Sequence, residues 1–449
     1  MLLRSMKMSK QEKVMKLYNF LKDNFYLSRP DLKIGAQAYN SHLLYSLLTQ
    51  LNNGTQLIFG SWGTGKTAAQ KYQNTLSYGL PLEVIQGAII RGSPQITRED
   101  VIGRPDYGKM SQGEEEVRWQ KFCLIPPKIW DEIDKTPEGT QAIALAGIEE
   151  GSWTYLNGHI LEGRRPFYAT ANYASRGSYN ITEALLDRMD IATATKFPGL
   201  VNTDKISRRY NREQEDLLKD ERIAKEAIKI LLSKDDYETI HNNLNPLRKE
   251  FLGKLNKANV PILKDEEKLE INKEIGKINF DELAELYCTL LTAELNIPAR
   301  GNYLRSFMDK SLESRRVDQA VVRYAQALAW LQNKDKVTLE YVLAVAPYAL
   351  WHKVKWNDNI LGNTAFASYR DRGDLELIVT KKLLNEGVQN VKGLKTRLLE
   401  NRENIEEMRN LIEKNDEENL KKKLEEITVT GGTHPYFTDL RREMEDFEE

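Results

Sequence analysis

The stretch "GSWGTGKT" at residues 60–67 decides how this chain is read. It follows the apolar run "QLIF" and precedes the helical pattern "AAQKYQNTL", so a glycine-rich loop joins a strand to a helix. Glycines let consecutive N–H groups turn inward, and the positive end of the following helix attracts anions. The spacing predicts a nucleotide-phosphate loop, with Lys66 on the β- and γ-phosphates and Thr67 on Mg²⁺; the alternative is a glycine-rich turn without a ligand. The predicted binding residues are Gly60, Ser61, Trp62, Gly63, Thr64, Gly65, Lys66 and Thr67.

Two adjacent acids follow a second apolar run, in "KIWDEIDKTPEGTQ" at residues 128–141. If the loop holds a magnesium nucleotide, Asp131 is placed to hold the metal and Glu132 to orient or deprotonate the attacking water. The alternative is a pair of solvent-facing acids that open a helix. Pro126 and Pro127 cannot donate to a sheet, so the strand is expected to begin at or after Lys128 and to be short.

Two further polar residues end apolar runs downstream. Asn172 closes the strand-like "PFYATAN", and its amide can bridge a γ-phosphate and a water, although asparagine also simply ends strands. Arg188 lies in "EALLDRMD" before the next strand-like run. Its alternative role is a surface ion pair with Asp187 or Asp190.

Length, composition and charge limit the classes of protein to which this chain can belong. A chain of 449 residues with 41% hydrophobic residues is expected to form two or three domains. Lys plus Arg (65) nearly balance Asp plus Glu (66), so no global field favours nucleic acid or an anionic membrane. Cys123 and Cys288 form no metal-binding spacing, and the histidines His42, His159, His241 and His434 are too scattered for a metal set. With no apolar run of membrane length or signal peptide, a cytoplasmic protein without membrane insertion is expected.

The pattern of expected secondary structure changes near residue 200. Before it, the strand-like runs "QLIFG", "LEVIQGAII", "KIW", "PFYATAN" and "IATATKF" alternate with helical ones, which is typical of a parallel sheet covered by helices. We predict an α/β domain at residues 1–200 and a helical domain at 201–355. The charged segment near 234–277 is either a helical insertion or a mobile linker. A helical hairpin is predicted within residues 356–449.

These motifs, in this order, resemble the AAA+ ATPases and specifically the MoxR family, in the helix-2-insert group. "ITREDVIGRPDYG" at residues 96–108 resembles the segment that leads into an insertion in the second helix. "WTYLNGHIL" is similar to the family's β-hairpin, and Asn157 with Gly158 independently predicts its two-residue turn. The resemblance covers roughly residues 25–355. It implies an αβα sandwich with a five-stranded parallel sheet in the order 5-1-4-3-2, an α-helical lid and a C-terminal helical extension.

The resemblance also assigns roles. Lys66 and Thr67 match the Walker A pair, Asp131 and Glu132 the Walker B pair, and Asn172 sensor 1. Arg188 matches the arginine finger, and Arg316 matches sensor 2, unless the neighbouring Arg315 takes that place. ATP and Mg²⁺ are the implied cofactors, with Thr67 and Asp131 as metal ligands. The chain departs from the family at Trp62, where proline is usual, and at Asp134-Lys135, where Asn-Arg is usual.

Three functions follow from these features. The first is an ATP-hydrolysing homo-oligomer, usually a hexameric ring in this family, that remodels protein complexes as a chaperone, with a protein client and a partner that carries a von Willebrand factor A domain. The second is a nucleic-acid motor or loader; the hairpin tip "LNGH" lacks Lys and Arg, but Arg164 and Arg165 lie at its base. The third is an ATP-gated scaffold without turnover, which is expected to lack Glu132 or the arginine finger.

Overall fold

The computed structural model of the chain describes residues 8–173, 180–208, 212–296, 304–312, 314–370, 372–386, 407–408, 410–411, 414 and 416–429. The chain divides into two compact units. One consists of Met1–Asp281 with Gln319–Ala349, and the other of Glu282–Asp318 with Leu350–Glu449. The limits of these units differ from the domain boundaries predicted at residues 200 and 355. Those boundaries rest on the pattern of expected secondary structure and stay a prediction.

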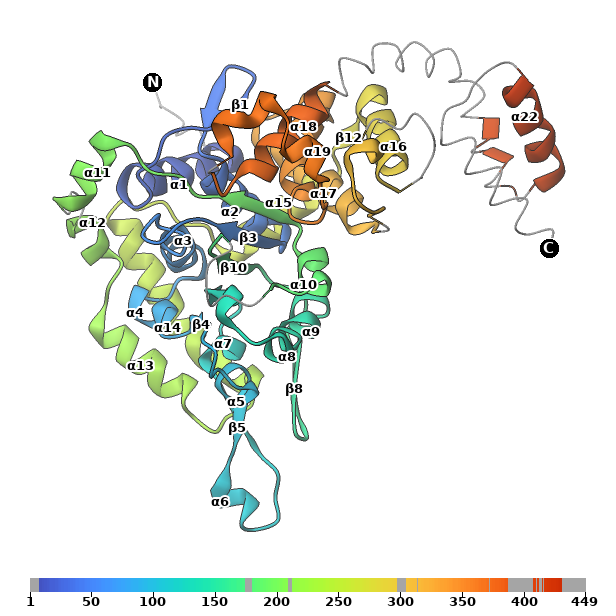
Figure 1. The fold of residues 1–449 in the computed structure, drawn as a ribbon. Helices are drawn as coiled ribbons and strands as arrows, with labels where there is room; N and C mark the ends of the chain where they lie inside the picture. Colours follow the sequence, from blue (N-terminus) through green and yellow to red (C-terminus); the bar gives the residue numbers. More distant parts are fainter. Residues whose placement is uncertain are drawn as a thin grey trace, which may run out of the picture. The chain divides into compact units, whose positions relative to one another are not determined.

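The first unit is built on a five-stranded sheet (Figure 1). Its strands in spatial order are β11 (Ile191–Ala194), β3 (Thr55–Phe59), β10 (Phe167–Ala171), β7 (Lys128–Asp131) and β4 (Ile90–Arg91). Counted along the chain, this is the predicted order 5-1-4-3-2, which is confirmed. Every pair is parallel, so the carboxyl ends of all five strands meet at one edge of the sheet.

One predicted strand is largely wrong. Within "LEVIQGAII" only Ile90 belongs to β4, and the first five residues form α4 (Leu82–Gln86). Pro81 precedes that helix, where its missing N–H does no harm, and Gly87 ends it. By contrast, β7 begins at Lys128, directly after the two prolines, as predicted.

Helices gather around the loop that follows β3. The helix before β3, α2 (Ser41–Asn52), is buried along its whole length and contacts β3 and β11. It also contacts α1 (Lys10–Asn24) and α3 (Ala68–Tyr78), the helix that follows the glycine-rich loop. The other short elements of this unit are β1 (Leu32–Ile34), β2 (Gln37–Tyr39), α7 (Lys121–Leu124), the 3-10 turn η1 (Ile133–Lys135), α8 (Glu138–Gln141), α9 (Ile143–Glu149) and α10 (Glu183–Arg188).

Two antiparallel ribbons project side by side from the first unit (Figure 1). The arm between β4 and β7 consists of α5 (Arg98–Val101), β5 (Gly103–Pro105), α6 (Tyr107–Met110) and β6 (Val117–Trp119). The second ribbon is the predicted hairpin, β8 (Ser152–Tyr155) and β9 (Gly158–Leu161). Its turn differs from the prediction: Tyr155 pairs with Gly158, so Leu156, with φ of 47°, and Asn157 make the turn. Asn157 Nδ2 donates to Glu115 of the arm at 2.6 Å.

The charged segment near 234–277 is mostly helical and forms part of the first unit. Five helices follow β11: α11 (Leu200–Ser207), α12 (Arg212–Leu217), α13 (Glu221–Leu231), α14 (Tyr237–Lys257) and α15 (Asp265–Ile275). Arg248 of α14 donates through Nε to the Tyr78 carbonyl at 2.7 Å, and Lys268 of α15 reaches the Ser77 carbonyl at 2.9 Å. Both lysine and arginine therefore satisfy carbonyls at the C-terminal end of α3, as cations commonly do there.

The remaining elements are mainly helical. The first unit also contains the parallel pair β12 (Asn279–Phe280) and β13 (Lys336–Val337), most of α17 (Arg316–Leu331) and most of α18 (Leu339–Leu350). The second contains α16 (Glu282–Asn296), η2 (Arg305–Phe307), α19 (Asp358–Leu361), η3 (Thr364–Tyr369), a helix at 375–386 and α22 (Glu417–Val429). The C-terminal hairpin, predicted within residues 356–449, falls only in part on described residues: α22 is described, whereas residues 387–406 and 430–449 lie outside the described part of the chain.

Candidate active site

The loop between β3 and α3 has the backbone that its glycines predict. Gly63 and Gly65 have φ of 74° and 78°, a conformation that residues with a side chain rarely adopt. At Gly60 the reason is space, because an added Cβ would lie 1.9 Å from Oγ1 of Thr195. Thr64 secures the loop, since its hydroxyl donates to the Ser61 carbonyl at 2.7 Å.

Lys66 is folded back into this loop. Its Nζ donates to the carbonyls of Gly60 at 2.8 Å and Ser61 at 3.2 Å, and to Oδ1 of Asn172 at 2.8 Å. The side chain is 8% exposed, and burial lowers the pKa of Lys66, although Asp131, Asp134 and Glu132 oppose that shift. An ammonium held by three oxygens is ready to exchange them for phosphate oxygens.

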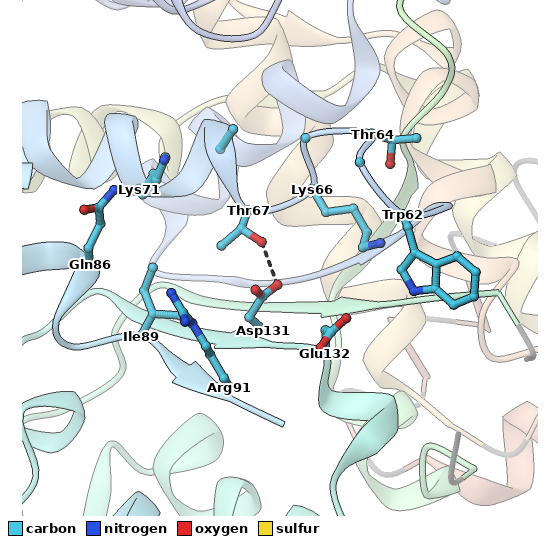
Figure 2. A pocket seen from close by; sticks show the side chains of 13 residues that line it. Trp62, Thr64, Lys66, Thr67, Lys71, Gln86, Ile89, Arg91, Asp131 and Glu132 are labelled. Carbon is cyan, nitrogen blue, oxygen red and sulfur yellow. Dashed lines mark hydrogen bonds between the residues drawn. The ribbon is translucent and has the colours of Figure 1, made fainter. Parts of the chain in front are cut away.

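Asp131 lies at the end of β7 and faces Thr67, as Figure 2 shows. Its Oδ1 accepts from the Thr67 hydroxyl at 2.6 Å and from the Thr170 hydroxyl of β10 at 2.6 Å. Among the described residues, no cluster of three or more His, Cys, Asp or Glu side chains could hold a metal. Mg²⁺ needs no such cluster, because it keeps several waters and takes one or two carboxylates beside phosphate oxygens. One carboxylate and one hydroxyl beside a phosphate loop fit that ion.

Glu132 occupies an unusual backbone conformation at the same edge of the sheet. Its φ of 53° and ψ of 49° lie in the left-handed region, which is strained by roughly 1–3 kcal/mol in a residue other than glycine. Its N–H donates to Thr170 Oγ1 at 2.9 Å, and its carboxylate pairs with Lys135 Nζ at 2.8 Å. Its carbonyl oxygen lies so close to Gly92 that a Cβ there would approach it to 1.9 Å. Several contacts therefore fix the position of the Glu132 backbone from which the carboxylate extends.

Asn172 follows β10 and is 7% exposed. Its Oδ1 accepts from Lys66, and its Nδ2 donates to Asp134 Oδ2 at 3.4 Å. Asp134 is 3% exposed, and burial raises its pKa.

A cavity of about 440 Å³ lies over the glycine-rich loop, Asp131 and Glu132. This volume is within the range of small-molecule sites. Its wall also includes Lys71 of α3, Gln86 of α4, Arg91 of β4 and Ile89, which directly precedes β4 (Figure 2). Sequence reasoning missed these residues. Lys71 could have been predicted to line the site, because it lies one helical turn after Thr67. Arg91 could not, because the strand that it ends was not predicted correctly.

Comparisons with known proteins agree with the fold of this chain. The AAA lid domain family matches residues 311–366, C-terminal to the sheet that carries the phosphate loop. The chain has the AAA+ ATPase fold. A solved structure from Cytophaga hutchinsonii, described as a candidate ATPase, is similar with a TM-score of 0.56 and 18% identity, over 84% of this chain and 94% of that one. YeaC of Bacillus subtilis (strain 168), named as uncharacterized, is 24% identical over 323 residues, 69% of this chain and 80% of its own length.

Within this AAA+ fold, two predicted arginines lie outside the cavity wall. Arg188, at the end of α10, pairs with Glu149 at 2.9 Å and donates to the Ala184 carbonyl at 3.0 Å. Arg316 begins α17 and belongs to the second unit, where its N–H donates to Ser314 Oγ at 3.2 Å. Their finger and sensor 2 roles remain predictions from the resemblance.

The arginines that kept a nucleic-acid role open are engaged with acids. Arg164 pairs with the buried Asp190 at 2.9 Å, and Arg165 lies 3.9 Å from Glu162. Asp190 also accepts from Arg323 of α17 at 2.6 Å. These contacts favour a structural role at the base of the hairpin over phosphate binding.

A membrane-spanning role finds no support in the part of the chain that the structure describes. None of the helices there has both the length and the apolar composition that crossing a bilayer requires.

Proposed function

We propose that this chain binds ATP with Mg²⁺ and hydrolyses it. The observation that carries the proposal is the contact of Thr67 with Asp131 at 2.6 Å, beside Lys66, at the wall of a cavity of nucleotide size. A hydroxyl that directly follows a phosphate-binding lysine and touches a strand-end carboxylate is the arrangement that a magnesium nucleotide needs.

Binding rests on the loop and on α3. The backbone N–H groups around residues 62–67 and the N-terminus of the 11-residue α3 supply donors to the phosphates. Lys66 leaves the carbonyls of Gly60 and Ser61 and pairs with the β- and γ-phosphates. Thr67 and Asp131 would hold Mg²⁺, which neutralises charge on the phosphate oxygens when bound.

Hydrolysis rests on Glu132 and Asn172. Glu132 accepts a proton from the attacking water or orients it, because its carboxylate lines the cavity next to Lys66. Asn172 accepts from Lys66 Nζ at 2.8 Å and holds that amine or the water in place.

We further propose that copies of the chain assemble into a ring, hexameric as in MoxR relatives. AAA+ proteins typically oligomerise, and Arg188 is not part of this chain's own cavity wall. To act on a neighbouring subunit's nucleotide, Arg188 has to exchange its ion pair with Glu149 for phosphate oxygens. An arginine supplied in this way accelerates phosphoryl transfer by about 10³- to 10⁵-fold. An isolated subunit is then expected to hydrolyse slowly.

The biological role that we propose is MoxR-like remodelling of a protein complex in the cytoplasm. Its support is the resemblance of the phosphate loop, the acid pair, the arm and the hairpin, together with the AAA lid match. A protein client, with a von Willebrand factor A domain partner, is the expected target. The pairing of Arg164 and Arg165 with acids disfavours the nucleic-acid motor.

The test is ATP turnover by the purified full chain. Hydrolysis is expected to require Mg²⁺, to rise per subunit with protein concentration, and to be lost in Glu132→Gln and Arg188→Ala. Retained ATP binding without turnover in the wild type refutes the enzyme and favours the scaffold, and stimulation by DNA favours the motor. Glu132→Gln, which binds ATP without releasing phosphate, is the bait for isolating the client.

A further inference from the structure

Asp134 is a buried carboxylate next to the candidate site that the proposed function does not use. It lies in η1, three residues after Asp131, and is 3% exposed. It is not part of the cavity wall. Its Oδ2 accepts from Asn172, whereas its Oδ1 has no hydrogen-bonding partner among the residues that the structure describes. Burying a carboxylate destabilises a protein unless the group has a compensating contact, so its presence needs a reason.

The contacts of Asn172 define which way its amide points. Lys66 Nζ can only donate, so the atom facing it at 2.8 Å is the amide oxygen. The amide nitrogen is the atom that faces Asp134, and it donates to Oδ2 at 3.4 Å. The two neighbours therefore agree on one orientation, which a lone asparagine would not hold.

We propose that Asp134 is a positioning residue that locks the Asn172 amide with its oxygen toward Lys66 and the γ-phosphate side of the cavity. This proposal rests on the proposed ATPase function. Asp134 touches neither substrate nor cofactor, and it acts through Asn172.

The orientation has a chemical consequence. With its NH₂ committed to Asp134, Asn172 presents an acceptor to Lys66, which lines the cavity. It therefore holds the Lys66 ammonium or a proton of the attacking water, and does not donate to a phosphate oxygen. Without Asp134 only Lys66 orients the amide, and that contact weakens when Lys66 pairs with phosphate oxygens. The amide can then rotate between two orientations, and only one of them presents the oxygen. The loss falls on turnover, because nucleotide binding depends mainly on the loop and α3.

The test is a double-mutant cycle in the full chain, with kcat, KM and the Kd of a fluorescent ATP analogue as readouts. Asp134→Leu removes the acceptor at similar volume, and it is expected to lower kcat about tenfold with KM and Kd within about twofold. Asp134→Asn keeps an acceptor oxygen and is expected to retain kcat within about twofold of the wild type. In an Asn172→Ala background, Asp134→Leu is expected to change kcat by less than about twofold, because there is no amide left to orient.

The outcomes separate the two proposals. Equal losses from Asp134→Leu with and without Asn172, or a loss in Asp134→Asn as large as in Asp134→Leu, overturn the positioning role while the ATPase stands. A wild type that neither binds nor hydrolyses ATP overturns both. Asp106→Leu, which removes another buried carboxylate (4% exposed) on the arm, measures the purely structural loss and is expected to be additive with Asn172→Ala. If Asp134→Leu does not fold, Asp134→Ala replaces it in the same cycle.

Discussion

Gly92 offers the sharpest test of how Glu132 is placed. It directly follows β4, and its N–H donates to the Asp131 carbonyl at 2.7 Å. A Cβ at this position would lie 1.9 Å from the Glu132 carbonyl oxygen and 2.8 Å from Oγ1 of Thr136. Contacts of a Cβ below 3.0 Å are essentially never seen, so Gly92→Ala must move the Glu132 backbone by about 1 Å.

The size of the effect follows from that displacement. Misplacing a catalytic group by about 1 Å lowers turnover by about 10²-fold, or about 3 kcal/mol of barrier. The glycine-rich loop lies on a different strand end, so the Kd for ATP is expected to stay within about threefold, less than 1 kcal/mol. We therefore expect kcat to fall about 100-fold at nearly constant affinity.

Steady-state phosphate release and equilibrium ATP binding measure the two quantities, with thermal unfolding to confirm that the variant folds. Gly139→Ala is the matched control, because a Cβ there would meet no atom within 4 Å. It is expected to behave as the wild type. If Gly92→Ala turns over ATP at the wild-type rate, or loses affinity as much as turnover, then Glu132 is not held in the way that we describe.

Other predictions test neighbouring contacts. Lys135→Gln breaks a half-exposed ion pair with Glu132, so kcat is expected to fall less than about fivefold, which corresponds to about 0.2–1 kcal/mol. Lys225→Gln is the control, because its ion pair with Glu221 is exposed and does not involve Glu132. A loss of kcat above tenfold in Lys135→Gln contradicts a merely orienting contact. Lys128→Met removes the ammonium that lies 2.7 Å from the buried Glu162 and leaves the more distant Arg165, at 3.9 Å, as its cationic neighbour, so urea unfolding is expected to show a loss of about 3–5 kcal/mol. The double variant Lys128→Met with Glu162→Gln is expected to recover most of that loss, and no recovery refutes the ionic explanation. Burial lowers the pKa of His42 to about 3 and of His241 to about 4, below the unfolded value near 6.5. Between the folded and the unfolded pKa of each histidine, the unfolded state therefore binds more protons than the folded state. Lowering the pH from 7 to 5 is expected to lower the free energy of unfolding by about 2 kcal/mol for each histidine. Equal urea midpoints at pH 7 and pH 5 contradict this.

The sheet could be predicted from the sequence because its parallel strands are continuous apolar runs with motifs at their ends. Phe167–Ala171 and Ile191–Ala194 are buried throughout, and such runs are read without knowledge of their neighbours. The run at residues 82–90 misled us because Leu82, Val84 and Ile85 are buried on one side of a short helix, which over five residues looks like strand alternation. The hairpin turn slipped by one residue because Leu156 takes a left-handed conformation that favours asparagine or glycine.

The glycine-rich loop, Asp131, Glu132 and Asn172 could be located because each lies at the end of a strand or directly after it. Gly92, Asp134 and Arg91 could not be assigned a place, since their importance lies in contacts between segments 40 residues or so apart, such as Gly92 with Glu132 and Asp134 with Asn172. No local pattern encodes such pairs. For the same reason the sequence showed that 234–277 could be helical, but not that Arg248 and Lys268 dock it on the end of α3.

Trp62, at the edge of the phosphate loop, is 71% exposed. The other six tryptophans are buried or partly covered, and Trp130 and Trp153 are 0% and 1% exposed. A collisional quencher such as iodide therefore reaches one indole far more readily than the rest, and that indole borders the cavity. The fraction of the tryptophan fluorescence that iodide quenches therefore comes mainly from Trp62. Changes in that fraction can follow ligand binding at the phosphate loop in real time, without any attached dye.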